Sequence, residues 1–322
     1  MLKRLTTVSA AVAIVAGTTF GPGMTAAGAT DFVRIATAGS GGNYYRLGGG
    51  LAAIYNDELD GVRASIQATG GSVENLDLLA DEAVEVAYLT GSVGQQAFTN
   101  TGRFADRPAG RYDGLRAIAT VYPNPQWFIA VDEDIQSMAD LAGKRVSVGS
   151  QGGAGETWWR SIMEHKGWTY DDIEPEFTVH QAAIDQVRNR QIDALVWPDA
   201  PGSASIQQVA DTGRARALDI DPDVIEFMTA DSLDYAYTLP ASANPFGDDE
   251  IKTFASPITF ATHTGMSDGD IYELTKTMFE NKERLIGVHP LAEYMTLEEA
   301  TKGLPFPLHP GAERYYREQG IM

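Results

Sequence analysis

The chain has 322 residues, of which 43% are hydrophobic, contains no cysteine and carries a formal charge of −20. The lack of cysteine excludes disulfides, thiolate nucleophiles, cysteine-ligated zinc and a lipid anchor attached to a cysteine. Binding to a phosphate backbone needs clustered Lys and Arg, so the acidic composition also excludes a nucleic-acid partner.

The first 29 residues show the order of features of a secretory signal peptide. Lys3 and Arg4 precede an apolar run at 5–16, and small residues follow as far as Ala29. The run is shorter than the roughly twenty residues that span a bilayer, and the A-x-A pattern places cleavage after Ala29. We therefore expect an exported monomeric protein that begins at Thr30, keeps 293 of the 322 residues and has a formal charge of −22.

Apolar runs of strand length alternate with segments of helical period from Thr30 onward, which is typical of an α/β fold. Between the runs, apolar residues recur at the spacing of one helix face, as at Leu47, Leu51 and Ile54. The last such helix is expected at 271–285. The predicted strands are 32–38, 62–69, 84–90, 127–131, 145–149, 192–197 and 251–262, the last interrupted at Pro257.

The chain divides into two similar halves. Pro123 and Pro125 bracket a turn at which a crossing between domains is expected, and the stretch 239–246 marks the return. We therefore predict two domains, each with a mainly parallel sheet flanked by helices. The first domain comprises 30–124 and 242–322, and the second comprises 125–241.

Three glycine-rich turns each follow a predicted strand and precede a predicted helix, at 37–45, 69–75 and 149–157. The first turn of a helix exposes unpaired N–H groups and about half a positive charge, so it binds anions. Glycine lets a ligand approach the main chain closely. One such turn is ordinary in an α/β loop, but three in a strongly acidic chain indicate that local dipoles hold an anionic ligand.

Aromatic and hydroxyl side chains accompany these turns. Tyr44 and Tyr45 follow the first turn, and because successive residues of a helix face different ways, we expect one in the site and one beside it. Ser72 is expected to cap a helix or to contact the ligand. Trp197, which ends a strand and precedes Pro198, either lines the cleft or fills a core.

No pattern of catalytic residues is complete. The segment from Gly39 to Tyr44 lacks the third glycine of a dinucleotide site, no serine fits G-x-S-x-G, and the five histidines are scattered. We therefore expect no catalytic residue, no metal and no cofactor. Two alternatives stay open: an exported hydrolase or dehydrogenase that uses the same cleft, and a sensor component that presents a ligand.

Six stretches, spread in order over nearly the whole mature chain, resemble the TAXI-type solute receptors of TRAP transporters. They are GSGGNYYRLGGGLA, TGGSVENLDLLA, DLAGKRVSVGSQGGAGE, RNRQIDALV, IYELTKTMFEN and GLPFPLHPGAERYYREQG. The resemblance implies a periplasmic binding protein whose two α/β domains, joined by hinge strands, close on a small carboxylate such as glutamate or 2-oxoglutarate. It also implies delivery of that ligand to the membrane subunits of a TRAP transporter, without enzymatic activity.

The ligand turns of that family fall on 40–45, 70–75, 90–92 and 152–157 of this chain. Arg46 and Asp199 stand where the family's pattern differs, and Arg46 is either a carboxylate reader or an exposed side chain. These departures leave the identity of the carboxylate open. The expected ligand-binding residues are Ser40, Gly41, Gly42, Tyr44, Tyr45, Gly71, Ser72, Asn75, Thr90, Ser92, Gly152, Gly153, Gly155, Glu156, Thr157, Trp197 and Pro198.

Overall fold

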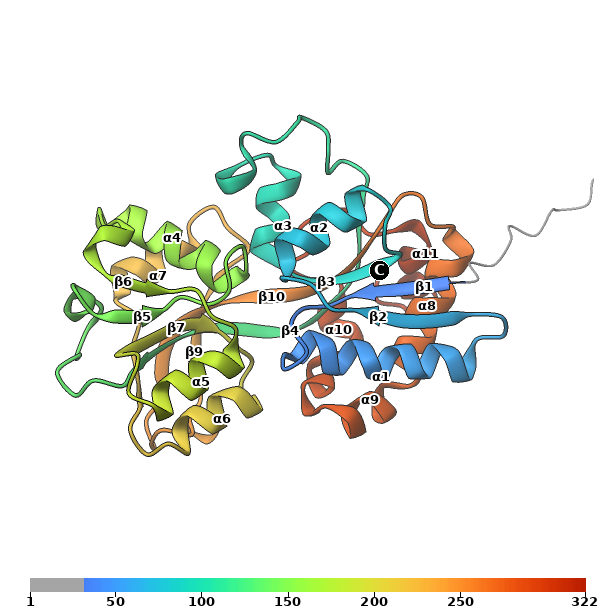
Figure 1. Cartoon of the computed structure of the whole chain (residues 1–322). Helices are drawn as coiled ribbons and strands as arrows, with labels where there is room; N and C mark the ends of the chain where they lie inside the picture. Colours follow the sequence, from blue (N-terminus) through green and yellow to red (C-terminus); the bar gives the residue numbers. More distant parts are fainter. Residues whose placement is uncertain (1–31) are drawn as a thin grey trace, which may run out of the picture.

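The computed structural model describes residues 32–322, so the predicted signal peptide at 1–29 lies outside the described residues. Figure 1 shows two lobes side by side, with the long strands β4 (Leu115–Ala130) and β10 (Ile251–His263) running between them. The strands of the described chain form one ten-stranded sheet with the central order β2-β1-β3-β10-β4-β7-β5-β6. The predicted α/β fold is confirmed.

The first lobe repeats the pattern of strand, glycine turn and helix. Its elements are β1 (Phe32–Ala36), α1 (Asn43–Glu58), β2 (Arg63–Gln67), α2 (Ser72–Ala80), β3 (Val86–Thr90), α3 (Gly91–Phe98), α8 (Asp268–Glu280), α9 (Lys282–Val288), α10 (Leu297–Ala300) and α11 (Pro310–Glu318). β1 pairs in parallel with β2 and β3, while β10 lies antiparallel between β3 and β4. The single helix predicted at 271–285 is two helices, separated at Asn281.

The second lobe has the same design around shorter strands. Its elements are β5 (Arg145–Ser147), α4 (Ala154–Lys166), β6 (Glu174–Glu176), α5 (His180–Arg188), β7 (Ala194–Pro198), α6 (Ala204–Ala210), β8 (Arg216–Leu218), α7 (Pro222–Thr229) and β9 (Tyr235–Leu239). β5 pairs in parallel with β6 and β7. β4 pairs antiparallel with β7 and β8, and β9 pairs antiparallel with β10. Short 3-10 helices lie at Gly102–Phe104, Met138–Leu141, Tyr170–Asp172, Ala241–Ala243 and Pro290–Tyr294.

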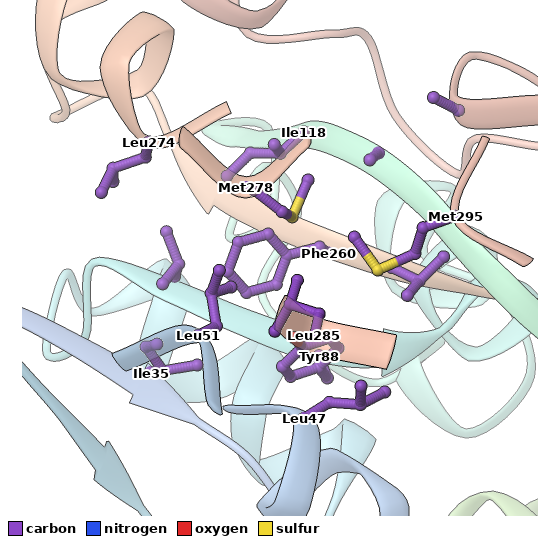
Figure 2. Close-up of a cluster of buried hydrophobic side chains, with 14 of the residues drawn as sticks. Ile35, Leu47, Leu51, Tyr88, Ile118, Phe260, Leu274, Met278, Leu285 and Met295 are labelled. Atoms are coloured by element: carbon purple, nitrogen blue, oxygen red, sulfur yellow. The ribbon is translucent and has the colours of Figure 1, made fainter. Parts of the chain in front are cut away.

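Each lobe has its own hydrophobic core. In the first lobe, Leu47 and Leu51 of α1 are fully buried because they recur at the helical period. Figure 2 shows them around the ring of Phe260, against which Tyr88 packs with ring centroids 4.8 Å apart. A separate cluster that includes Trp158 fills one side of the second lobe. Most residues of each cluster come from one lobe, although Ala200 of the second lobe belongs to the first-lobe cluster.

The crossing between the lobes is rich in proline. Pro257 of β10 faces Pro123 of β4, and Pro125 lies two residues further along β4. Proline has no N–H to donate, so the ladder has fewer hydrogen bonds here than a regular pair of strands. β10 nevertheless continues through Pro257, so the predicted interruption is wrong, and the register shifts one residue later. A weakened ladder between two packed lobes is a suitable hinge.

The domain boundaries at 124/125 and 241/242 stay a prediction. β4 changes partner from β10 to β7 between Pro125 and Gln126, which lies close to the first boundary. Phe246 packs on the second-lobe residue Trp127, with ring centroids 6.2 Å apart. The first part of β10, Ile251–Ala255, pairs with β9 of the second lobe. Both observations favour a return of the chain to the first lobe within β10 rather than at 242.

Candidate ligand-binding site

A cavity of about 320 Å³ lies between the lobes, at the ends of the parallel strands. Its first-lobe wall consists of the loops after β1 and β2 and the end of β3. Its second-lobe wall consists of the loops after β5 and β7 and the start of α5. All three predicted glycine turns contribute to it. In open α/β sheets, ligands bind in the crevice at the carboxyl ends of the strands, which is where this cavity lies.

Four helices begin at the cavity, two from each lobe. α1 and α2 start after Gly42 and Gly71, and α4 and α5 start after Gly153 and Val179, which all line the cavity. Within the described chain, no side chain caps these four positions. The N–H groups of the first turns therefore lack intrahelical partners, and each helix end carries about half a positive charge. Helix ends of this kind are suited to binding an anion.

Hydroxyl groups gather on the first-lobe wall. Ser72 Oγ accepts a hydrogen bond from the Thr90 N–H at 3.0 Å and lies 3.3 Å from Thr90 Oγ1. Thr90 Oγ1 is also 3.3 Å from the hydroxyl oxygen of Tyr44. Ser72 is the first residue of α2 and does not cap it, because the cap position is Gly71.

Tyr44 keeps its proton at neutral pH. Burial raises the pKa of Tyr44 to about 12, although the hydrogen bonds with Thr90 and Ser72 lower it. The ring stacks on Tyr88 with centroids 5.5 Å apart, which fixes its direction. A phenol held in this way can donate a hydrogen bond to an acceptor on a ligand.

Two glycines are required by the shape of the site. Gly71 has a φ of 107°, which residues with a side chain rarely adopt. At Gly155, an added Cβ would lie 2.8 Å from Cδ of Pro198 and 3.5 Å from Cα of Trp197. The first turn of α4 therefore packs directly on the end of β7, and this contact holds the second-lobe wall together.

Eleven of the seventeen predicted residues line the cavity. Their spatial proximity agrees with the prediction, and their contact with a ligand remains a proposal. They are Ser40, Gly41, Gly42, Tyr44, Gly71, Ser72, Thr90, Gly153, Gly155, Trp197 and Pro198. Trp197 lies both in the wall and in the second-lobe core, and the ring of His180 packs on it edge to face with centroids 4.2 Å apart.

The remaining six predicted residues lie outside the cavity wall, and their contact with a ligand stays a prediction. Glu156 is the clearest case, because it is fully buried and its carboxylate accepts hydrogen bonds from Arg103, Arg160 and Tyr170. Burial opposes its ionisation, but Arg160 and Tyr170 hold the pKa of Glu156 below its usual value. The others are Tyr45, Asn75, Ser92, Gly152 and Thr157.

These residues support the structure around the cavity. The buried amide of Asn75 donates to the carbonyl oxygens of Thr37 and Tyr88, at 2.6 and 2.7 Å, so it ties the loop after β1 to β3. Thr157 Oγ1 donates to the Gly153 carbonyl at 2.9 Å. Ser92 Oγ accepts from the Trp158 indole N–H at 3.1 Å, which links the lobes. Arg46 is exposed and is not part of the cavity wall.

Several residues of the wall were not expected from the sequence. Asp199 is 3% exposed, and its Oδ1 accepts from Asn43 Nδ2 of the first lobe at 2.6 Å. Asp199 had a signal in the sequence, since it departs from the family's pattern directly after Trp197 and Pro198. Thr69 and Ser150 belong to the predicted glycine turns. The other residues are brought to the cavity only by tertiary packing; they include Tyr122, Asn124, Thr178, His180 and Gln181.

The two lobes also touch away from the wall. Arg103 Nη1 of the first lobe donates to Glu156 Oε2 at 3.2 Å and to Thr157 Oγ1 at 3.0 Å on α4. The Leu233 N–H of the second lobe donates to Gln95 Oε1 of α3 at 3.0 Å. With the Asn43–Asp199 and Ser92–Trp158 bonds, these contacts hold the lobes together over the cavity.

Within residues 32–322, no three His, Asp or Glu side chains gather in a way that would hold a metal ion. None of the described helices combines the length and the apolar character needed to cross a membrane.

The described chain is a two-lobed α/β fold with a cavity between the lobes. Residues 35–320 match the NMT1-like family, and the chain belongs to that family. The fold is similar to XAC2383 of Xanthomonas citri bound to ATP, with a TM-score of 0.51, 10% identity, and 91% of this chain and 97% of that chain covered. It is also similar to a binding protein component of an ABC phosphonate transporter from Pseudomonas aeruginosa, with a TM-score of 0.51, 10% identity, and 82% and 79% of the chains covered. An ancestral arginine-binding protein bound to arginine gives a TM-score of 0.50 at 13% identity, with 83% and 99% covered.

Proposed function

We propose that the protein is a periplasmic solute receptor that binds a small organic anion between its lobes and delivers it to a membrane transporter. The ligand is a carboxylate of the size of glutamate or 2-oxoglutarate. The observation that carries this proposal is the meeting of four uncapped helix N-termini, two from each lobe, at one cavity. Membership of the NMT1-like family and the likeness to binding proteins support it.

Main-chain dipoles rather than cationic side chains hold the anion in this proposal. Among the described residues that line the cavity there is no Lys or Arg. A chain with 44 Asp and Glu and only 24 Lys and Arg offers an anion no long-range attraction. The helix ends act only over short distances, so binding needs the ligand to be enclosed by both lobes.

Closure of the lobes is the mechanism. A ligand that contacts helix ends from both lobes binds the closed form more tightly than the open form, and only this difference shifts the population. The proline-rich crossing supplies the hinge. The Arg103–Glu156 and Asn43–Asp199 contacts then form as the lobes meet.

The transporter is of the TRAP type in this proposal. The support is the sequence resemblance to TAXI-type receptors over nearly the whole chain, most of all the stretch GLPFPLHPGAERYYREQG. An ABC transporter is the alternative partner, because a structurally similar protein is a component of one. Genes for TRAP membrane subunits beside this gene support the first partner, and genes for an ABC permease and ATPase contradict it.

Calorimetry combined with small-angle X-ray scattering tests the receptor function. The mature protein is titrated with dicarboxylates, 2-oxo acids and acidic amino acids, and the radius of gyration is measured with and without each compound. We expect at least one acid to bind and to compact the protein. Binding without compaction contradicts the closure mechanism, and the absence of any binding contradicts the proposed ligand class.

A further inference from the structure

Asp199 brings a carboxylate to the wall of the cavity. It is the one carboxylate among the described residues of the wall, and none of those residues is Lys or Arg. Asp199 is 3% exposed and belongs to none of the salt bridges of the described chain, although its electrostatic interaction with His289 acts to raise the pKa of that histidine. Its charge is felt by the neighbouring phenols, because it contributes to the raised pKa of both Tyr44 and Tyr122.

The hydrogen bonds of Asp199 come from neutral donors only. Its Oδ1 accepts from Asn43 Nδ2 at 2.6 Å and from the Ala200 N–H at 2.8 Å. Its Oδ2 accepts from Ser205 Oγ. A carboxylate has about four lone-pair positions, so one position remains for a further donor. A buried carboxylate without a counter-charge is costly, and a cation in the cavity would compensate it.

The negative and positive parts of the wall adjoin. Asn43 is the first residue of α1, whose N-terminus belongs to the anion site, and its amide touches Asp199 directly. A ligand whose anionic group lies at the start of α1 therefore has its next substituent close to Asp199. The carboxylate and the ammonium of an α-amino acid are separated by one carbon and fit this arrangement.

From this arrangement we infer that Asp199, with Asn43 beside it, is an ammonium subsite and that the ligand is an α-amino acid. The inference rests on the proposed receptor function and narrows its ligand class. The ammonium of the ligand donates to Asp199, and its carboxylate accepts from the N–H groups of the helix ends. A 2-oxo acid has a carbonyl oxygen where the amino acid has the ammonium. That oxygen would face the Asp199 carboxylate without a proton to share, so the 2-oxo acid binds more weakly.

The test compares pairs of compounds that differ only at the α-carbon. L-Glutamate is compared with 2-oxoglutarate, and L-leucine with 4-methyl-2-oxopentanoate, by isothermal titration calorimetry on the mature protein at pH 7.5. In whichever pair binds, we expect the wild type to bind the amino acid at least tenfold more tightly than the corresponding 2-oxo acid. Asp199→Asn should lower the affinity for the amino acid by about tenfold to a hundredfold and leave the 2-oxo acid unchanged or improved. Asp248→Asn, an exposed acid outside the cavity, is the matched control and should behave as the wild type.

The outcomes separate this inference from the receptor function. If the 2-oxo acid binds as tightly as its amino partner, the receptor function stands and the ammonium subsite is overturned. If Asp199→Asn lowers the affinity for both members equally, Asp199 only holds the turn to Ser205, and the inference fails as well. If neither member of any pair binds, the proposed ligand class fails and the inference with it. The wild-type comparison needs no variant, so it decides the question even if Asp199→Asn does not fold.

Discussion

Replacing Asp234 by asparagine is expected to stabilise the protein at neutral and alkaline pH and to change little in acid. Asp234 precedes β9 and is 5% exposed, and its Oδ1 has no hydrogen-bond partner among the described residues. Burial raises the pKa of Asp234 to about 7, although the hydroxyls of Ser92 and Ser256 lower it. These serines belong to the first lobe and to the strand that crosses between the lobes, so the carboxyl lies at the lobe interface.

The magnitude follows from proton linkage. In the folded protein Asp234 loses its proton near pH 7, whereas in the unfolded chain it does so near 3.8. The folded state therefore holds the proton more tightly, and its contribution to stability is complete below about pH 4 and is lost as the pH rises to about 7. A difference of about three pKa units corresponds to about 4 kcal/mol, which is an upper bound. Asparagine does not titrate and keeps both a donor and an acceptor.

Urea unfolding of the wild type and Asp234→Asn at several values from pH 4 to pH 8 measures this effect. The difference in the free energy of unfolding should rise with pH in favour of the variant, from near zero to at most about 4 kcal/mol. Asp248→Asn, an exposed acid, is the control and should show no such rise. A difference that stays constant over the whole range would refute the reasoning, as would a carboxyl signal of Asp234 that titrates near pH 4 by NMR.

Three other changes test the supports and the wall of the cavity. Glu156→Gln leaves Arg103 and Arg160 beside a neutral amide. We expect urea titrations at pH 7 to show a free energy of unfolding about 3 kcal/mol lower than that of the wild type. A loss below about 1 kcal/mol would contradict a buried ion pair. Gly155→Val places side-chain atoms against Pro198. The affinity for the ligand found by calorimetry should fall at least tenfold. An unchanged affinity would show that the start of α4 is not part of the site. Tyr44→Phe should lower the affinity for the same ligand about fivefold to tenfold. Tyr45→Phe is the control and should leave the affinity unchanged. Equal effects of the two substitutions would remove Tyr44 from the proposed site.

The local signals in the sequence predicted the framework of the site. The turn at 37–45 could be placed because glycine between an apolar run and a helical period fixes both the turn and the direction of the helix start. Of the two adjacent tyrosines, Tyr44 lines the cavity and Tyr45 does not, which agrees with the expectation that they face different ways. These are consequences of the period of a helix and need no tertiary information.

The environment of Glu156 has a signal in the sequence that the prediction of a ligand contact did not consider. Arg160 lies four residues further along the same helix, which is the spacing of an ion pair on one face. That pairing turns the carboxylate away from the cavity, where the sequence had placed it. Arg103 completes the ion pair from a segment more than fifty residues away, and no local pattern predicts such a contact.

Asn43 and Asp199 illustrate what the sequence alone does not contain. They are 156 residues apart and meet only because the lobes lie face to face. The continuous strand through Pro257 has a similar cause, because β10 pairs with β4 on both sides of this proline, from Ala255 to His263. In both cases tertiary pairing, rather than local preference, decides the structure.

A crystal structure of the mature protein with its ligand tests the central claim most directly. The ligand is the compound that the protein retains through purification or, failing that, the tightest acid of the calorimetric panel. The account predicts that the ligand lies in the cavity, with an anionic oxygen within hydrogen-bond distance of main-chain N–H groups at the start of α1 or α2 and of α4 or α5. A ligand that is bound elsewhere, or that contacts the helix ends of one lobe only, would contradict it.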